Sequence, residues 1–204
     1  MNKKEALAKL HSYVSSDGTI VTWKCKDIHG SKLRTRIKLR TKFYNIEEAL
    51  INDFIDTIKF LYPKVKSIRY YPKRSEVEIR NHTISKDILN FGKVWSRNWE
   101  FPKNLTQKQK VLWIRAFADC EGTVQNSNYD RFIAMDSVNL KGLKDVLKEL
   151  KKLGINGNFY NIKGGSSYRI KIFRKDNLQK FNKLIGFLHP IKQEKLSLAI
   201  KSYR

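Results

Sequence analysis

The sequence predicts an α+β protein made of two pseudo-symmetric halves, each with the element order αββαββα. Three observations carry this prediction. A motif recurs at half the chain length, strand-like alternation falls between helical segments in both halves, and both halves are strongly basic. Antiparallel sheets with helices on their outer face leave the other face open. We place the two repeats at 1–97 and 107–204, with a linker at 98–106.

The repeated motif is a helical segment that ends in an acidic residue, Gly, Thr and an apolar residue. It reads EALAKLHSYVSSDGTI at residues 5–20 and QKVLWIRAFADCEGTV at residues 109–124. The acidic residues, Asp17 and Glu121, are 104 positions apart, which is half of the 204-residue chain. A duplicated unit is the simplest explanation of such a period.

The same elements are expected after each copy of the motif. In the first half these are strands at 19–26 and 33–42, a helix at 46–60, strands at 66–72 and 76–82, and a helix at 84–91. In the second half they are strands at 123–128 and 131–137, a helix at 139–153, strands at 157–162 and 167–173, and helices at 176–187 and 191–202. Pro102 bars a helix in the linker, and Thr106 is a suitable N-cap for the second motif helix.

The charge indicates the class of partner. Lys and Arg number 42 against 19 Asp and Glu, a formal net charge of +23. Residues 1–100 contribute +10 and residues 101–204 contribute +13, so neither half is a neutral domain with a basic tail. Both halves are expected to face one polyanion, and nucleic acid is favoured over a membrane surface. Charge alone leaves a ribosomal or merely basic protein open.

No segment of the sequence predicts secretion or membrane insertion. The N-terminal segment lacks the apolar core of a signal peptide, and no apolar run approaches the roughly 18 residues needed to span a bilayer. Cys25 and Cys120 do not have metal-finger spacing. We therefore expect an intracellular protein, in the cytoplasm or an organelle matrix, with no membrane partner.

The strand at 33–42 has the most specific charge pattern. All its even positions are basic, and its odd positions are apolar or Thr. Side chains alternate across a strand, so five cations are expected on one face while Leu33, Ile37 and Leu39 face the core. A ribbon of this kind can lie in the DNA major groove. A solvated outer face is the alternative, but such faces usually mix charge signs.

Polar residues extend this pattern on the preceding strand, and cations alternate with isoleucines in the second half. The arginines at 34, 36 and 40 could read guanines while the lysines hold phosphates, an assignment that the sequence leaves open. The predicted DNA-binding residues are Thr22, Lys24, Lys26, Arg34, Arg36, Lys38, Arg40, Lys42, Arg169 and Lys171.

Each motif ends in a carboxylate at a helix C-terminus, where the helix dipole disfavours negative charge. A divalent cation would reverse that penalty, and Asp17 and Glu121 are suitable oxygen ligands for Mg²⁺. Small residues four apart on each helix would let the two helices pack closely and bring both carboxylates together. Such a site can support phosphodiester cleavage. The predicted helix–helix contact residues are Ser12, Ser16, Ala116 and Cys120.

These motifs, at residues 10–18 and 114–122, resemble the LAGLIDADG motif of homing endonucleases, and 185–196 resembles the closing helix region of that family. With the repeat order, the resemblance covers essentially the whole chain. It implies a saddle-shaped protein that cuts both strands of a long DNA site across the minor groove with Mg²⁺ or Mn²⁺. The implied metal-binding residues are Asp17 and Glu121 with the adjacent Gly18 and Gly122, and the implied catalytic residues are Asp17, Glu121 and Lys192.

The family also places a polar residue on the second strand of each repeat, near the water network. Asp136 is the candidate in the second half, and Arg40 or Lys42 in the first. The first motif departs from the family pattern, with serines at 12, 15 and 16. Lys93 is the candidate counterpart of Lys192, and His11 is expected to be a partly exposed helix residue.

The resemblance implies a site-specific, intron-encoded double-strand endonuclease that acts as a monomer on duplex DNA. Two alternatives use the same scaffold. One is an RNA-splicing maturase with intron RNA as its partner, and the other is a DNA-binding protein that does not cleave. Because both motifs keep their carboxylates, the non-cleaving alternative is disfavoured.

Overall fold

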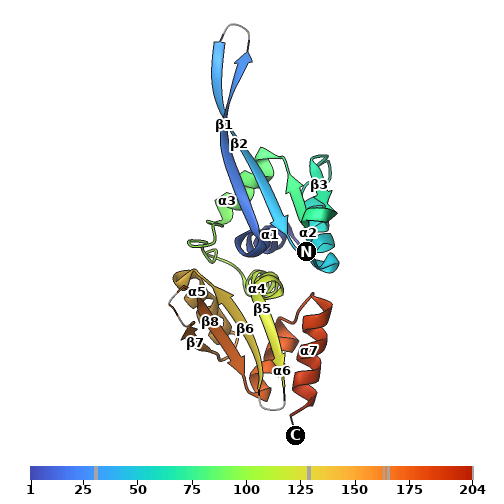
Figure 1. Cartoon of the computed structure of the whole chain (residues 1–204), viewed down its shortest axis with the longest axis vertical. Helices are drawn as coiled ribbons and strands as arrows, with labels where there is room; N and C mark the ends of the chain where they lie inside the picture. Colours follow the sequence, from blue (N-terminus) through green and yellow to red (C-terminus); the bar gives the residue numbers. More distant parts are fainter. Residues whose placement is uncertain (30–31, 128–129, 163, 165, 204) are drawn as a thin grey trace.

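The computed structural model describes residues 1–29, 32–127, 130–162, 164 and 166–203. Two α+β halves lie one after the other along the long axis of the molecule (Figure 1), and the helices α1 and α4 lie side by side where the halves meet. This is the predicted fold class. The order of helices and strands is as predicted in both halves, and the second half ends with the two expected helices, one more than the first half has.

The first half contains a long hairpin, a shorter strand pair and helices on one side. Its elements are α1 (Lys3–Asp17), β1 (Gly18–His29), β2 (Lys32–Tyr44), α2 (Glu48–Leu61), β3 (Ile68–Tyr71), a 3-10 turn (Pro72–Arg74), β4 (Glu76–Ile79) and α3 (His82–Phe91). The sheet order is β1-β2-β4-β3, antiparallel throughout. The 3-10 turn, which Pro72 begins, is an element that was not predicted.

The second half repeats this arrangement with shorter hairpin strands. Its elements are α4 (Gln107–Glu121), β5 (Gly122–Asn126), β6 (Arg131–Ser137), α5 (Leu140–Lys152), β7 (Asn158–Asn161), β8 (Tyr168–Phe173), α6 (Lys175–Leu184) and α7 (Pro190–Lys201). The sheet order β5-β6-β8-β7 matches the first sheet position for position. No helix among the residues in the described ranges is long and apolar enough to cross a membrane.

Local sequence explains why both motif helices begin where they do. Asn2 caps α1 and Thr106 caps α4, each with a reciprocal hydrogen bond from the residue three positions later, Glu5 or Gln109. Such capping boxes satisfy two backbone N–H groups that have no partner within the helix. The prediction of Thr106 as an N-cap is confirmed. The two capping residues are 104 positions apart in the sequence, as the two carboxylates are.

The two hydrophobic cores interlock through α1 and α4. Ala8 of α1 packs in the core of the second half, and Ala116 of α4 packs in the core of the first half. The Ser12 hydroxyl is buried and donates to the carbonyl oxygen of Trp113 at 2.7 Å. Small side chains thus let the two helix backbones approach, as predicted from the motif spacing.

His11 lies inside this helix pair, so the expectation that it is partly exposed is wrong. Its side chain is fully buried. The Trp113 indole N–H donates to His11 Nδ1 at 3.0 Å. Burial among aromatic rings lowers the pKa of His11 to about 4, because the charged imidazolium loses its hydration. The helical pattern did not show that a second helix would cover this face.

The hairpin β1–β2 projects beyond the sheet to which it belongs (Figure 1). This projection corrects the prediction that Ile37 lies in the core, since its side chain is 55% exposed. Leu39 is partly buried against the core, and the side chain of Leu33 lies outside the described residues. Nearer the helices, Ile20 and Phe43 on the same face are buried, so only the base of the hairpin covers a core.

Gly122 allows β5 to leave α4 without a break. A Cβ atom at this position would lie 2.2 Å from the carbonyl oxygen of Ala118, and a Cβ at Gly18 would lie 2.6 Å from Cα of Val14. We expect Gly122→Ala to destabilise the protein by about 1–3 kcal/mol, the usual cost of overpacking. Urea unfolding would measure it, with Thr123→Ala at the neighbouring exposed position as the control. Equal stability of the two variants would contradict this role of Gly122.

Candidate active site

The two carboxylates predicted from the repeat meet at the C-terminal ends of α1 and α4. Asp17 is the last residue of α1 and Glu121 is the last residue of α4. The thiol of Cys120, which is adjacent to Glu121, donates a hydrogen bond to Asp17. The negative charge of Asp17 also acts on the pKa of Glu121. The packing of α1 against α4 therefore brings both acids into one site.

Asp17 is held by a residue that the sequence analysis did not single out. The Asn45 amide donates to Asp17 Oδ2 at 2.8 Å, while Asn45 Oδ1 accepts from the backbone N–H of Glu47 at 2.9 Å. This second bond fixes the amide orientation. Burial raises the pKa of Asp17, against the opposing hydrogen bonds from Cys120 and Asn45 and the charge of Lys192.

Asn45 could have been found from the strand register. Gly18 pairs with Phe43 at the base of the hairpin, so the residues just after β2 lie beside the end of α1. That register places Asn45 next to Asp17, and an amide there can donate to a carboxylate. The sequence does carry a signal for this register, because Gly30-Ser31 between the two strand segments is a dipeptide typical of a two-residue hairpin loop.

Of the two carboxylates, Glu121 has the pKa that departs further from its usual value. Burial raises its pKa to about 7, and the negative charges of Asp17 and Asp136 add to the shift. Lys192 acts in the opposite direction. Two acids held together without a cation disfavour each other's ionised form, so the site is electrostatically suited to bind positive charge.

Lys192 reaches this site from α7. Its amino group donates to the carbonyl oxygens of Asp119 and Cys120, the latter at 3.3 Å, at the end of α4. A cation at a helix C-terminus interacts favourably with the helix dipole. Burial lowers the pKa of Lys192, while the nearby Cys120, Asp119, Asp17 and Glu121 oppose that change. The structure thus brings together Asp17 and Glu121 from the repeated motifs and Lys192, the residue implied by the family resemblance.

Asp119 positions the segment that delivers Lys192. Its Oδ1 accepts the backbone N–H groups of Leu188 and His189 at 2.9 and 3.0 Å, just before α7 begins. His189 Nε2 also lies 3.8 Å from Glu47 Oε2, at the start of α2. Burial raises the pKa of Asp119 to about 6, although both backbone donors act against the shift. Asp119 lies within the repeated motif, but no role was predicted for it.

The two halves of the protein contribute different residues to the site. The expected counterpart of Lys192, Lys93, forms an ion pair with Glu100 at 3.1 Å in the linker region, where both side chains are largely exposed. Lys93 is therefore not part of this site. Asn45 lies beside Asp17 in the first half, whereas a lysine from the additional helix α7 lies at the end of α4.

The donor set matches a hard divalent cation that also takes ligands from DNA and water. The site offers two carboxylates, and no group of three or more His, Cys, Asp or Glu side chains in the described ranges could hold a metal by itself. Mg²⁺ commonly binds through one or two carboxylates while phosphate oxygens and water complete its octahedron. The raised pKa values of Asp17 and Glu121 agree with that chemistry.

A pH-dependent stability follows from Glu121 in the metal-free protein. Its folded-state pKa of about 7 exceeds the usual 4.5, so folding takes up a proton between these values and stability falls as pH rises through that window. Glu121→Gln removes the penalty. We expect the variant to be more stable than the parent by roughly 1–3 kcal/mol at pH 8, with no gain near pH 4.5.

Urea unfolding in EDTA at the two pH values would measure this effect. Glu194→Gln, on the exposed side of α7, is the matched control and should change little at either pH. A Glu121→Gln variant that is less stable than the parent at pH 8 would show that the carboxylate is not penalised by burial.

The predicted DNA-binding residues of β2 fall into two groups. Arg34, Arg36 and Lys38 are exposed. Arg40 instead binds Glu78 at 2.7 Å and lies 4.9 Å from the Trp23 ring centroid, and Lys42 binds Glu76 at 2.8 Å. The inner part of this strand face therefore mixes charge signs, as expected for the alternative of a solvated outer face, and its exposed cations lie in its outer part.

The register corrects one further part of the DNA-binding prediction. Thr22, Lys24 and Lys26 are paired with Leu39, Ile37 and Thr35. They therefore share the face of these odd-numbered residues, opposite to the arginines of β2, rather than extending their row. Because the hairpin projects beyond the core, Lys24 and Lys26 are nevertheless exposed. Both faces of its outer part carry cations.

In the second half, the predicted residues already have partners. Arg169 makes a bidentate ion pair with Asp136, both bonds at 2.7 Å. The Lys171 amino group lies 3.8 Å from the ring centroid of Phe132. The charge of Asp136 reaches Glu121, as its effect on the Glu121 pKa shows. Asp136 thus lies near the site, as predicted, but its carboxylate is held by Arg169.

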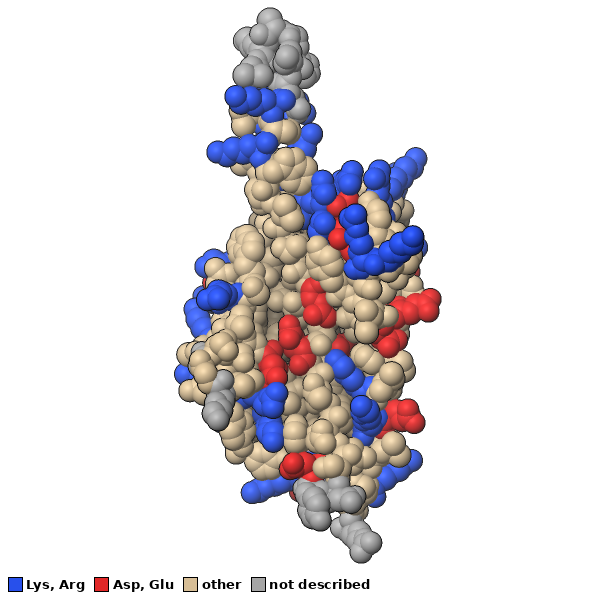
Figure 2. All heavy atoms as spheres, viewed as in Figure 1, with Lys and Arg blue, Asp and Glu red and all other residues tan. Residues whose placement is uncertain are grey.

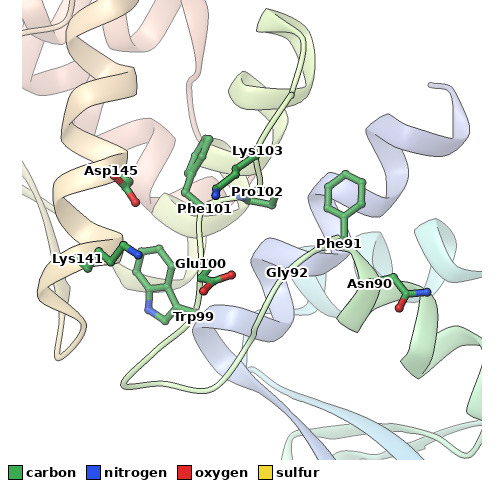
Figure 3. A pocket seen from close by; sticks show the side chains of 10 residues that line it. All are labelled: Asn90, Phe91, Gly92, Trp99, Glu100, Phe101, Pro102, Lys103, Lys141 and Asp145. Atoms are coloured by element: carbon green, nitrogen blue, oxygen red, sulfur yellow. The ribbon is translucent and has the colours of Figure 1, made fainter.

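Charge is distributed unevenly over the face seen in Figure 2. Acidic side chains gather near the middle, and Lys and Arg lie above and below them and along the projecting hairpin. A separate cavity between the linker and α5 (Figure 3) contains none of the predicted site residues. Lys103 and Lys141 line it together with Glu100 and Asp145, so its charge is mixed.

Comparison with known proteins agrees with this geometry. Residues 108–186, which contain the second motif and its sheet, match the family of the LAGLIDADG-like domain. This part of the chain is therefore similar to LAGLIDADG-like domains. A curated relative, the homing endonuclease I-ApeI of Aeropyrum pernix, is 26% identical over 102 residues. That alignment covers 48% of this chain and 46% of the relative, so it spans about half the length of each protein.

Solved structures share the fold over nearly the whole chain. I-DmoI in complex with DNA and Ca superposes with a TM-score of 0.69 at 18% identity, covering 97% of this chain and 98% of that chain. I-DmoI in complex with DNA and Mn gives a TM-score of 0.66 at 18% identity, with 90% and 97% covered. Full-length DUF199/WhiA from Thermatoga maritima gives 0.63 at 15% identity, covering 100% of this chain and 62% of that chain. At these identities the likeness establishes the fold alone.

Proposed function

We propose that this protein is a site-specific LAGLIDADG homing endonuclease that hydrolyses both strands of duplex DNA with Mg²⁺ or Mn²⁺. The observation that carries the proposal is the meeting of Asp17 and Glu121 at the ends of the paired helices, with Lys192 beside them. Within the described part of the chain, neither carboxylate forms an ion pair that would explain its burial. A site for metal-assisted hydrolysis explains why both acids are held at an electrostatic cost.

Two features support DNA as the substrate. The cationic hairpin and the two sheets provide an extended basic surface, and such surfaces bind duplexes by releasing counterions from the phosphates. The solved I-DmoI relatives are complexes with DNA. Both halves of the site come from one chain, so we propose that the monomer is the active form.

The chain's own residues have separable roles in the proposed reaction. Asp17 and Glu121 would hold the divalent cation, with Gly18 and Gly122 allowing close backbone approach at the helix ends. When bound, the cation would polarise the scissile phosphate and favour ionisation of an attacking water. Asn45 fixes the orientation of Asp17, and Lys192 provides a positive charge at the end of α4.

The non-cleaving alternative rests on the fold shared with DUF199/WhiA, whose name states no nuclease activity. The retained carboxylates in both motifs weigh against it. The alternative of an RNA-splicing maturase is supported by the resemblance to the family alone, so intron RNA stays a secondary candidate for the substrate. We further propose that the gene lies within an intron, which makes the uninterrupted host locus the natural substrate.

Cleavage of duplex DNA carrying that uninterrupted locus tests the proposal, with Mg²⁺ in one reaction and EDTA in the other. A discrete double-strand cut that requires Mg²⁺ is the expected result. Binding should weaken steeply as salt is raised, because many phosphate contacts release many counterions. Binding without a cut would favour the DNA-binding alternative, and no binding to duplex DNA would overturn the proposal.

A further inference from the structure

The hairpins of the two repeats have very different lengths. The β1–β2 ladder pairs residues from Gly18↔Phe43 out to His29↔Lys32, whereas the β5–β6 ladder runs only from Gly122↔Met135 to Asn126↔Arg131. Both ladders start at the glycine that follows a site carboxylate. At about 3.3 Å per residue, the first reaches about 36 Å from the site and the second about 13 Å.

The two hairpins point in opposite directions from the paired helices. In Figure 1 the β1–β2 hairpin extends to one end of the long axis, and β5 and β6 run toward the other end. A longer hairpin therefore extends over a longer stretch of any duplex that lies over both sheets. The difference of about 23 Å corresponds to about 7 base pairs at 3.4 Å each, or about 5–7 if the ribbon follows the slope of the groove.

The outer part of the long hairpin has the chemistry of a DNA contact rather than of a core. Arg34, Arg36 and Lys38 are exposed on one face, and Lys24 and Lys26 are exposed on the other. A two-stranded ribbon fits the major groove, which is about 12 Å wide and is walled by phosphates on both sides. Cations on both faces of a ribbon are suited to that enclosed position.

The outer end of the second sheet is instead contacted by residues that follow α7. Arg131, at the start of β6, donates from Nε to the Ser202 hydroxyl at 2.6 Å, and its guanidinium lies 5.1 Å from the Tyr203 ring centroid. The residues after α7 thus bind the end of this sheet. Phe132 and Phe173 are register partners beside it, and Lys171 lies over Phe132. The short hairpin is anchored to its own repeat.

We infer that the protein recognises an asymmetric duplex site, in which the first repeat reads an arm about 5–7 base pairs longer than the arm read by the second repeat. The cut then lies off-centre, nearer the end bound by the second repeat. This inference rests on the proposed endonuclease function, because arm lengths are measured from the cut. Arg36 and its neighbours are the specificity-determining residues of the outer part of the long arm.

Stepwise shortening of the duplex tests the inference. The cut is mapped on the uninterrupted host locus, and the duplex is then truncated by two base pairs at a time from either end. Cleavage should be lost earlier on one side, with the required arms differing by about 5–7 base pairs. Equal arms with a normal cut would overturn the asymmetry alone. Absence of both binding and cutting would overturn the proposed function.

Guanine-methylation interference assigns each arm to its repeat. Arg36→Ala should weaken binding about 5- to 150-fold and remove interference only at the outer part of the long arm. Lys171→Ala, in the second repeat, is the matched variant and should affect only the short arm. If Arg36→Ala alters the short arm, or weakens binding equally on all sequences, the first repeat does not read the longer arm.

Discussion

Asp17→Asn and Glu121→Gln should each abolish DNA cleavage while leaving DNA binding nearly unchanged. Both substitutions keep the size of the side chain and remove a negatively charged oxygen ligand. Loss of a residue that only orients a metal ligand typically costs 10- to 100-fold, so loss of a ligand should exceed about 100-fold. The readouts are single-turnover cleavage with Mg²⁺ and duplex binding without it.

The double variant tests whether the two carboxylates serve one site. If Asp17 and Glu121 serve the same site, the double variant should be little slower than either single variant, because residues acting as one unit are not additive. Multiplicative losses would indicate two independent sites. Full cleavage by either single variant would exclude that carboxylate from the reaction.

The second large effect is expected from Lys192→Met, which keeps much of the side-chain length and removes its charge. We expect a loss of about 10- to 100-fold in cleavage rate, the range for groups that act around a metal site. Lys192 lowers the pKa of both Asp17 and Glu121. Its removal should therefore move the acid limb of the cleavage pH profile to higher pH.

The pH profile separates this electrostatic role from a purely structural one. Lys192 also donates to carbonyl groups at the end of α4, so the variant could lose some stability, which urea unfolding would record. Lys195→Met, at an exposed position on the same helix, is the control and should cleave like the parent. An unchanged rate and pH profile for Lys192→Met would contradict its place in the site.

The repeat made most of the fold predictable. Two motifs 104 residues apart place Asp17 and Glu121 at equivalent helix ends. The small residues four positions apart on each motif helix predict the close contact of α1 and α4. The alternation in each half then predicts the strands, because periods of 2 and 3.6 residues are local properties of the chain. The family resemblance added Lys192, which spacing alone would not have selected.

The misplaced residues depend on contacts between distant segments. His11 has an ordinary helical context, and only the packing of Trp113 from the other repeat shows that it is buried. Ile37 alternates as a core residue would, but the core ends before the hairpin does. The ion pairs of Arg40 and Lys42 with β4 arise from strand order, which local periodicity does not contain.

Asn45 shows the same limit inside the site. It follows β2 in the sequence and is 28 residues from Asp17, with no motif around it. Strand register brings the two together, and finding Asn45 from the sequence requires counting that register from the hairpin turn back to the base of the ladder. Asp17 and Glu121 were thus predictable from the repeated motif, whereas Asn45, on a segment that packs beside the end of α1, was not found.

Binding of Mn²⁺ to the protein–DNA complex tests the central claim most directly, namely that Asp17 and Glu121 together hold the catalytic cation. Electron paramagnetic resonance of unbound Mn²⁺ during a titration gives the affinity without requiring cleavage. We predict that the parent complex binds Mn²⁺ and that Asp17→Asn and Glu121→Gln each weaken this binding strongly, with the DNA still bound. Unchanged Mn²⁺ affinity in either variant complex would contradict a metal site shared by the two repeats.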